Sequence, residues 1–393
     1  MDRLRAFPRT FNLTLGLVLL ILVSACSSPS RTQAPLPGDQ NTASQAAATS
    51  GPAQAQPAAA GSAVANCPPT GAAARLDGAG ATFPAPLYSR WFSEYNTLCK
   101  VEINYQSIGS GGGIAQHTAK TVNFGASDGI LTAAQKETAP GTLMIPTVAG
   151  AEAIVVNLPG IQRGQIKLTP ANLAAIYLGD IIKWNDPRIA ADNAGVTLPD
   201  LDIIVVHRAD GSGTTNIFTT YLSAVSRAWK DKVGAGNAVN WPTGLGGQGN
   251  EGVAGQVRQL PGGIGYVELA YARQNNMTWA SLQNKSGRFL EPSLDGTTAA
   301  MEGVQIPEST EVMIIDSANP NAYPISGFTW ILVYQDQTDA AVARSVAHML
   351  WWATHDGEKF ATDLDYAKLS PSAQKAAEAQ IKKIRVGGAA VIS

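Results

Sequence analysis

The sequence repeats one local arrangement: an apolar strand, a loop of glycine and hydroxyl residues, and then a helix. The clearest copy has the apolar residues 203–206, the polar loop 207–215 and a helix-like segment at 216–222. The first N–H groups of a helix lack partners within it, and the helix dipole favours negative charge there. Because the loop also carries Arg208, we interpret it as a site for an oxyanion. A capped turn with a surface Arg208–Asp210 pair explains the same residues equally well.

Three more stretches repeat this order of strand, glycine loop and helix. They cover residues 75–98, 101–120 and 122–135. In the first stretch, Thr82 and Phe83 lie directly before the helix, where backbone N–H groups have no helical partner. Ligands of open α/β sheets bind beyond the carboxyl ends of the strands. The four junctions therefore predict one cleft assembled from two lobes.

The remaining chain also has an α/β pattern. Residues 153–156 are continuously apolar, which is typical of a buried parallel sheet. Thr169 begins a predicted helix that Gly179 ends. Other helices are predicted near residues 115–120, 216–225, 253–257, 342–357 and 371–384, and other strands at 264–267 and 328–334. The pattern predicts an α/β protein throughout.

Composition limits the kinds of partner. The chain has 393 residues, enough for roughly two domains, and its formal net charge is −2. Because nothing supplies a basic stripe, we expect no nucleic-acid partner. The four histidines are scattered and no Cys/His spacing indicates zinc, so we expect neither a metal nor a cofactor.

Catalytic motifs are also missing, so we expect no catalytic residues. Residues 211–214 lack the lysine and spacing of a phosphate-binding loop, and neither Ser110 nor Ser212 lies in a G-x-S-x-G nucleophile elbow. Residues 244–249 match G-x-G-x-x-G, but no clear apolar strand precedes them. A dinucleotide site is therefore a weak interpretation.

The N-terminus has the pattern of an export signal. Residues 1–25 combine a basic segment with a short apolar one and end in a lipobox-like sequence before Cys26. We interpret Cys26 as a lipidated residue, with a plain secretory signal as the alternative. Residues 26–74 are poor in large apolar side chains and are expected to form a flexible linker. In an exported protein Cys67 and Cys99 are candidates for a disulfide, and two free thiols are the alternative.

Several motifs resemble one known family. They are residues 78–88, 105–113, 124–128, 176–179, 208–214, 241–250 and 263–268. In the same order they are similar to motifs of the bacterial high-affinity phosphate-binding proteins of phosphate-specific ABC transporters. The resemblance covers about residues 75–370 and is poor around 285–322.

The resemblance implies a two-lobed periplasmic-binding-protein fold of type II with a double-crossover hinge. Residues 75–148 and 325–393 would form the first lobe, and residues 149–324 the second. The implied phosphate ligands are Thr82, Phe83, Ser110, Asp128, Arg208, Ser212, Gly213 and Thr214, with Asp210 holding Arg208. The implied partners are inorganic phosphate and the permease subunits of the transporter. The chain would be a monomeric, extracytoplasmic lipoprotein attached to the membrane through Cys26.

Asp128 is the one acidic residue in the implied ligand set. Phosphate near neutral pH still carries a proton, and an ionised carboxylate can accept a hydrogen bond from it. Sulfate carries no such proton, so Asp128 would select phosphate over sulfate. Three alternatives stay open: a binding protein for sulfate or another oxyanion, a secreted phosphatase, and a phosphate sensor or adhesin.

Overall fold

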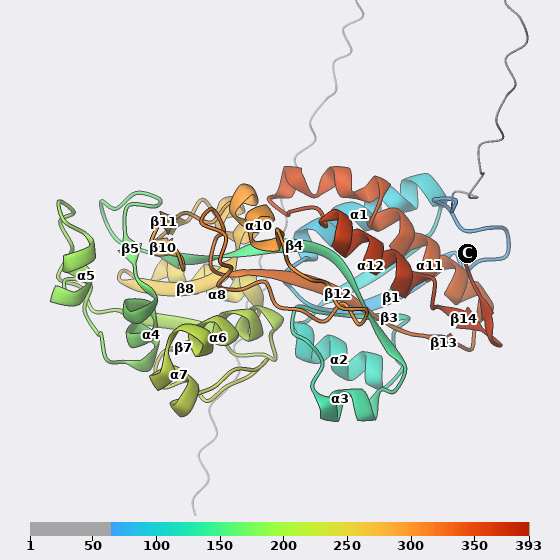
Figure 1. The fold of residues 1–393 in the computed structure, drawn as a ribbon, viewed down its shortest axis with the longest axis horizontal. Coiled ribbons are helices and arrows are strands. Elements are labelled where there is room, and N and C mark those ends of the chain that lie inside the picture. Colours follow the sequence, from blue (N-terminus) through green and yellow to red (C-terminus); the bar gives the residue numbers. More distant parts are fainter. Residues whose placement is uncertain (1–63, 393) are drawn as a thin grey trace, which may run out of the picture. The chain divides into compact units, whose positions relative to one another are not determined.

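The computed structural model describes residues 64–392, and helices alternate with strands along most of this range (Figure 1). The α-helices are α1 (Ala85–Cys99), α2 (Ser110–Thr118), α3 (Ala133–Thr138), α4 (Pro170–Leu178), α5 (Pro187–Asp192), α6 (Gly213–Val225), α7 (Arg227–Lys232), α8 (Gly249–Gln259), α9 (Leu269–Gln274), α10 (Leu294–Met301), α11 (Ala340–Ala353) and α12 (Pro371–Ile381). The strands are β1 (Arg75–Gly80), β2 (Glu102–Ser107), β3 (Phe124–Ser127), β4 (Thr142–Val156), β5 (Lys167–Leu168), β6 (Ile204–Arg208), β7 (Leu245–Gly247), β8 (Gly263–Glu268), β9 (Thr278–Trp279), β10 (Ser281–Gln283), β11 (Phe289–Leu290), β12 (Ser326–Tyr334), β13 (Asp336–Gln337), β14 (Arg385–Val386) and β15 (Ala389–Ala390). The α/β class predicted from the sequence is confirmed.

Several predictions lie outside the described residues. These are the signal peptide at residues 1–25, the lipidation site Cys26 and the linker up to residue 63. Within residues 64–392, no helix is both long enough and apolar enough to cross a bilayer.

One sheet of nine strands organises the described fold. Its order is β2-β1-β3-β12-β4-β8-β6-β7, and β9 pairs with β4 at one side. The strands β1, β2 and β3 are parallel to one another. The strands β6, β7 and β8 form a second parallel group. In the sheet that the structure describes, β12 and β4 lie between the two groups and run antiparallel to their neighbours.

Strand β4 belongs to both groups of strands. It pairs with β12 along Thr142 to Ala151 and with β8 along Glu152 to Val156. The prediction of a parallel sheet at residues 153–156 is therefore wrong. Nearly every β4 residue is buried, so the apolar run reflects coverage of both strand faces and not the direction of the neighbouring strand.

Helix termini largely follow the local sequence signals. Helix α4 has Thr169 as its N-cap and ends at Gly179 with φ of 79°. Helix α2 is an exception, because it begins at Ser110, five residues before the predicted start at Ala115. The glycines in its first turn have low helix propensity, but tight packing requires them: a Cβ on Gly113 would overlap the Gly80 backbone. The early start places Ser110 at the helix N-terminus.

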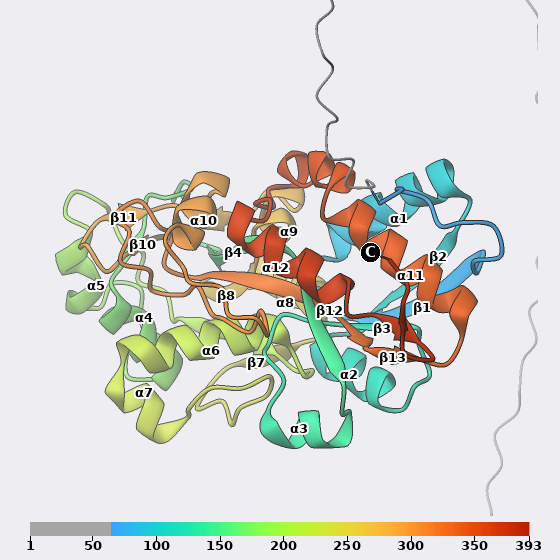
Figure 2. The same cartoon turned by 45° about the vertical axis from the view of Figure 1, so that its right-hand side comes forward.

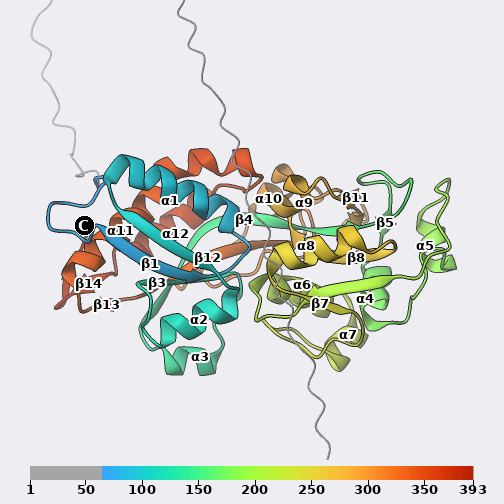
Figure 3. The same cartoon turned by 180° about the vertical axis from the view of Figure 1, so that it is seen from behind.

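Helices cover both sides of the first group of strands. Helices α1, α11 and α12 lie on one side of β1, β3 and β12, and α2 lies on the other (Figures 1 and 3). On the second group, α6 packs against β8 and continues into α7 (Figure 2). Large aromatic side chains are fully buried in both groups, including Trp91 and Trp330 beside the first strands and Trp184 and Tyr266 beside the second.

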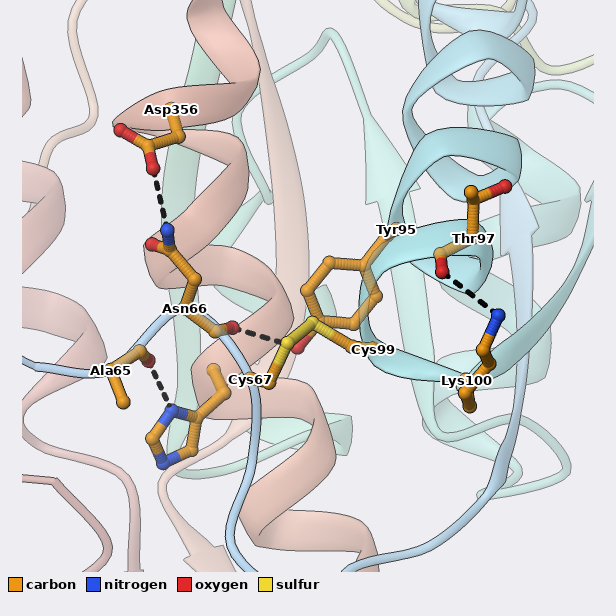
Figure 4. The surroundings of a disulfide bond; sticks show 9 residues. Ala65, Asn66, Cys67, Tyr95, Thr97, Cys99, Lys100 and Asp356 are labelled. Atoms are coloured by element: carbon orange, nitrogen blue, oxygen red, sulfur yellow. Dashed lines mark hydrogen bonds between the residues drawn. A yellow bond between two sulfur atoms is a disulfide. The ribbon is translucent and has the colours of Figure 1, made fainter.

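The first described residues are fastened to helices of the first group (Figure 4). Cys67 forms a disulfide with Cys99, the last residue of α1, and the two Cα atoms are 5.2 Å apart. Ala65 accepts a hydrogen bond from the His348 ring on α11 at 2.7 Å. The Asn66 side chain donates to the carboxylate of Asp356. The chain is thus held from Ala65 onward.

Candidate anion-binding site

The predicted ligand residues come together where strands of both groups end. Thr82, Phe83, Ser110, Asp128, Arg208, Ser212 and Thr214 are each at most 3% exposed, and Gly213 is also buried. The residues lie where β1, β2, β3 and β6 end or where the following helix begins, in the order that the sequence pattern indicates. The four strand–glycine–helix junctions therefore meet at one place.

Ser110 links the two groups of strands. Its Oγ accepts hydrogen bonds from the N–H of Gly213 at 3.0 Å and of Asp128 at 3.2 Å. Next to it, the N–H of Gly111 donates to the carbonyl of Gly211 at 2.7 Å. A side chain on Gly213 would collide with Ser110 and Asp128, so glycine is required for this close approach.

Arg208 supplies the positive charge. Its Nε donates to Oδ1 of Asp210 at 2.8 Å and its Nη2 to Oδ2 at 2.5 Å, which is a two-pronged ion pair. Nη1 remains directed to Oγ1 of Thr214 at 3.3 Å. Burial opposes ionisation of Asp210, but the hydrogen bonds and charge of Arg208 hold its pKa below the usual value. Asp210 fixes the guanidinium and offsets part of its charge.

Four backbone N–H groups at the site have no acceptor among residues 64–392. They belong to Thr82, Phe83, Ser110 and Thr214. Each lies just before a helix or in its first turn, where the helix itself provides no acceptor. Buried N–H groups are rarely left unpaired, so this arrangement suits an external acceptor.

Asp128 is the acidic group of the site. Its Oδ1 accepts from the hydroxyl of Thr329 at 2.7 Å, and its Oδ2 accepts from Ser110 at 3.4 Å. Burial raises the pKa of Asp128 to about 7, against the lowering effects of Thr329, Arg208 and Ser110. Asp128 can therefore exchange a proton with a bound ligand near neutral pH.

Asn250 and Thr329 are two site residues that the sequence reasoning missed. The Nδ2 of Asn250 donates to Oγ1 of Thr82 at 2.7 Å and to Oγ1 of Thr214 at 3.1 Å. Its position was signalled, because it ends the motif at residues 241–250. Thr329 had no sequence signal, since it reaches Asp128 from β12.

The G-x-G-x-x-G stretch contains a fifth strand–glycine–helix junction. Residues 245–247 form β7, and α8 begins at Gly249. The N–H of Gly249 donates to Oδ1 of Asp210 at 3.0 Å. This helix start supports the Arg208–Asp210 pair through Asp210.

Two buried carboxyl groups lie near the point where β4 passes between the groups of strands. Glu152 and Glu268 are opposite each other in the β4–β8 ladder, and both are fully buried. Neither oxygen of Glu152 has a hydrogen-bond partner within residues 64–392. Glu268 accepts from the N–H of Ala270 at 2.7 Å, and its Oε2 lies 3.0 Å from the hydroxyl oxygen of Tyr366. Burial raises the pKa of both groups well above the usual value.

The chemistry of the site would suit a tetrahedral oxyanion. Donors come from N–H groups, hydroxyls and one guanidinium, and Asp128 can accept a proton from the ligand. Among the residues that the structure describes, no cluster of three or more His, Cys, Asp or Glu side chains could hold a metal ion.

Comparisons with known proteins agree with this description. Residues 46–349 match the PBP superfamily domain. The chain is 46% identical to the phosphate-binding protein PstS of Pasteurella multocida, over 78% of this chain and 90% of that protein. It is 44% identical to PstS of Haemophilus influenzae, over 75% of this chain and 88% of that protein.

A solved structure shows the same fold. The phosphate-binding protein from Stenotrophomonas maltophilia superposes with a TM-score of 0.61 at 19% identity, covering 78% of this chain and 93% of that one. The fold and site therefore define a two-lobed solute-binding protein of the periplasmic-binding-protein class. Within that class, the chain belongs to the PstS family of phosphate-binding proteins.

Proposed function

We propose that the chain binds inorganic phosphate between its two lobes and delivers it to an ABC importer. One observation supports this most directly: a buried carboxyl group, Asp128, lies in a site otherwise made of hydrogen-bond donors. A ligand that carries both negative charge and a proton matches this combination. The PstS proteins to which the chain is similar are named for phosphate binding.

The donors divide into three groups. The N–H groups of Thr82, Phe83, Ser110 and Thr214 would donate to phosphate oxygens, as would the hydroxyls of Thr82, Ser110, Ser212 and Thr214. The N–H of Gly213 would also donate to phosphate if its hydrogen bond to Ser110 breaks. Nη1 of Arg208 would provide the charged contact. Charge-assisted hydrogen bonds are worth roughly 1.5–3 kcal/mol each, so a set of this size is consistent with sub-micromolar binding.

Asp128 would provide the selectivity. Bound phosphate and Asp128 would share one proton between them, which the raised pKa of about 7 supports. Sulfate has no proton to share and would face a buried negative charge. A site that depends on one specific hydrogen bond rejects an analogue that cannot make it.

We assign residues 75–148 and 325–393 to the first lobe and residues 149–324 to the second. In this division β4 crosses from the first lobe into the second, β12 begins directly after the chain has returned to the first lobe, and the C-terminal helices α11 and α12 belong to the first lobe. Contacts such as Ser110 with Gly213, and the Arg273–Asp365 ion pair at 2.9 Å, then join the lobes. Ligand binding would shift the lobes toward this closed arrangement.

We also propose the cellular setting that the sequence predicts. The chain would be a monomeric extracytoplasmic lipoprotein, anchored through Cys26, with permease subunits as its partners. We infer no enzymatic role, because no activated nucleophile or metal-ligand cluster accompanies the site within residues 64–392. Hydrolysis of a generic phosphomonoester by the pure protein would contradict this inference.

Titration calorimetry of the mature protein with phosphate and with sulfate tests the proposal. We expect tight, one-to-one binding of phosphate and far weaker binding of sulfate. Equal affinities would contradict the role of Asp128, and no phosphate binding would overturn the function itself. Small-angle scattering with and without phosphate tests closure, which identical curves would contradict.

A further inference from the structure

Three tyrosine hydroxyls donate to three consecutive carbonyl groups behind the anion site. Tyr105 donates to the carbonyl of Ala81 at 2.7 Å. Tyr271 donates to that of Thr82 at 2.6 Å, and Tyr366 to that of Phe83 at 2.6 Å. The carbonyls of Ala81, Thr82 and Phe83, which lie between β1 and α1, therefore each accept a hydrogen bond from a tyrosine hydroxyl.

The three tyrosines come from separate parts of the chain. Tyr105 lies on β2, beside β1. Tyr366 follows the last short helical turn before α12. Tyr271 lies on α9, which packs against β8 and α8 in the second lobe. Its bond to Thr82 therefore crosses between the lobes.

Peptide geometry connects these carbonyls to the site. In a trans peptide unit the C=O and N–H groups point in opposite directions, and the described chain has no cis peptide bond. The carbonyl of Ala81 shares its peptide unit with the N–H of Thr82, and that of Thr82 with the N–H of Phe83. A hydrogen bond to the carbonyl orients the unit and strengthens the opposite N–H as a donor.

We propose that Tyr105 and Tyr271 are positioning residues for the oxyanion: their hydroxyls orient and polarise the two peptide units whose N–H groups, at Thr82 and Phe83, donate to it. Because Tyr271 acts from the opposite lobe, the Phe83 donor is completed only on closure. The inference rests on the proposed function, since it concerns how the same site binds phosphate.

The two hydroxyls remain donors under ordinary conditions. Burial raises the pKa of both Tyr105 and Tyr271 well above the usual value, so neither ionises near neutral pH. The Thr82 carbonyl also accepts from the N–H of Ala85 at 3.2 Å. Removing the Tyr271 hydroxyl therefore does not leave this carbonyl without a partner.

Tyr366 provides a matched control. Its hydroxyl makes the same kind of bond in the same loop, but the Phe83 carbonyl shares its peptide unit with Pro84. Proline has no N–H, so this bond has no donor to polarise. Tyr366→Phe should affect stability without weakening the anion contacts.

The experiment compares phosphate affinity by calorimetry and melting temperature for the mature protein and its Tyr105→Phe, Tyr271→Phe and Tyr366→Phe variants. We expect Tyr105→Phe and Tyr271→Phe each to weaken phosphate binding about three- to tenfold, the range for one lost hydrogen bond. We expect Tyr366→Phe to stay within about twofold of the unchanged protein, whatever its melting temperature.

A spectroscopic readout separates positioning from general loss of structure. The ¹⁵N shift of a backbone amide responds to hydrogen bonding at the preceding carbonyl. With phosphate bound, Tyr271→Phe should shift the amide of Phe83, and Tyr105→Phe that of Thr82. If the unchanged protein binds phosphate and Tyr105→Phe and Tyr271→Phe bind it with the same affinity, the positioning role is wrong and the proposed function stands. Equal weakening in all three variants would also overturn the positioning role, whereas no binding by the unchanged protein would overturn the proposed function.

Discussion

The hydroxyl of Thr329 donates to Oδ1 of Asp128 across 2.7 Å, although the two residues are 201 positions apart. Thr329 lies on β12, one of the two strands that join the groups of the sheet. A strand that joins the two groups therefore helps to orient the acidic group. A change in β12 should alter ligand discrimination without touching the ligand.

The protonation of Asp128 predicts pH-dependent selectivity. Its pKa of about 7 means that it gains a proton as the pH falls. A protonated carboxyl can donate to sulfate, so sulfate affinity should rise roughly tenfold when the pH is lowered from about 8 to about 6. Calorimetry with sulfate at both pH values measures this. Asp128→Asn cannot titrate, so it should discriminate less between phosphate and sulfate at both pH values. A sulfate affinity of the unchanged protein that does not depend on pH would refute the prediction.

The Arg208–Asp210 pair predicts a non-additive effect on stability. Its side chains are 1% and 9% exposed, and removing one partner of a buried pair leaves an uncompensated charge. Arg208→Met should lower the free energy of unfolding by about 3 kcal/mol. Adding Asp210→Asn to Arg208→Met should restore most of this stability but no phosphate binding. Urea unfolding of the single and double variants measures both effects, and additive losses would argue against the pair.

Glu152 predicts that stability falls as the pH rises. Its folded pKa lies well above its ordinary value of 4.5, so the folded state keeps a proton that the unfolded chain releases. When the folded state binds more protons, the free energy of unfolding decreases with rising pH above the unfolded pKa. Both Glu152→Gln and Glu152→Met should make this dependence shallower, because neither residue ionises.

The two variants separate ionisation from hydrogen bonding. Glu152→Met also removes the unpartnered oxygens, so at pH 8 it should be at least roughly 1 kcal/mol more stable than the unchanged protein. Glu152→Gln keeps a buried polar group and should gain less. Urea unfolding of the three proteins between about pH 5 and pH 8 measures their free energies of unfolding and tests both expectations. If both variants are less stable than the unchanged protein at pH 8, the carboxyl group makes a stabilising contact and the prediction is wrong.

The disulfide predicts a loss of stability on reduction. The bonded cysteines are 32 positions apart, and closing a loop of that length is worth about 3–4 kcal/mol by the chain-entropy relation. A Cys67→Ser, Cys99→Ser variant should lose about that much while retaining phosphate affinity, because neither residue touches the site. Thermal unfolding of the variant, and of the unchanged protein with and without reductant, measures the loss. If neither the substitutions nor reduction lowers the stability, the crosslink does not stabilise the fold.

Local patterns predicted the parts of the fold and site that depend on local physics. Strand–glycine–helix junctions expose N–H groups wherever they occur, so the positions of Thr82 and Thr214 could be predicted from local sequence. Ser110 came from the family resemblance, because the local pattern placed the start of its helix at Ala115. The positions of Thr329 and Tyr271 could not, because their contacts depend on how distant strands and helices pack. The direction of β4 was also inaccessible, since burial on both faces produces the same apolar run in either direction.

The Cys67–Cys99 bond determines how tension on the N-terminal chain reaches the fold. A pull on the chain before Ala65 passes through the crosslink to α1 and through His348 to α11, and both helices pack on the first group of strands. Neither β4 nor β12 takes part in these two contacts. If the protein is anchored through Cys26 as proposed, tension on the anchor would therefore act on the first group of strands and not directly on the second.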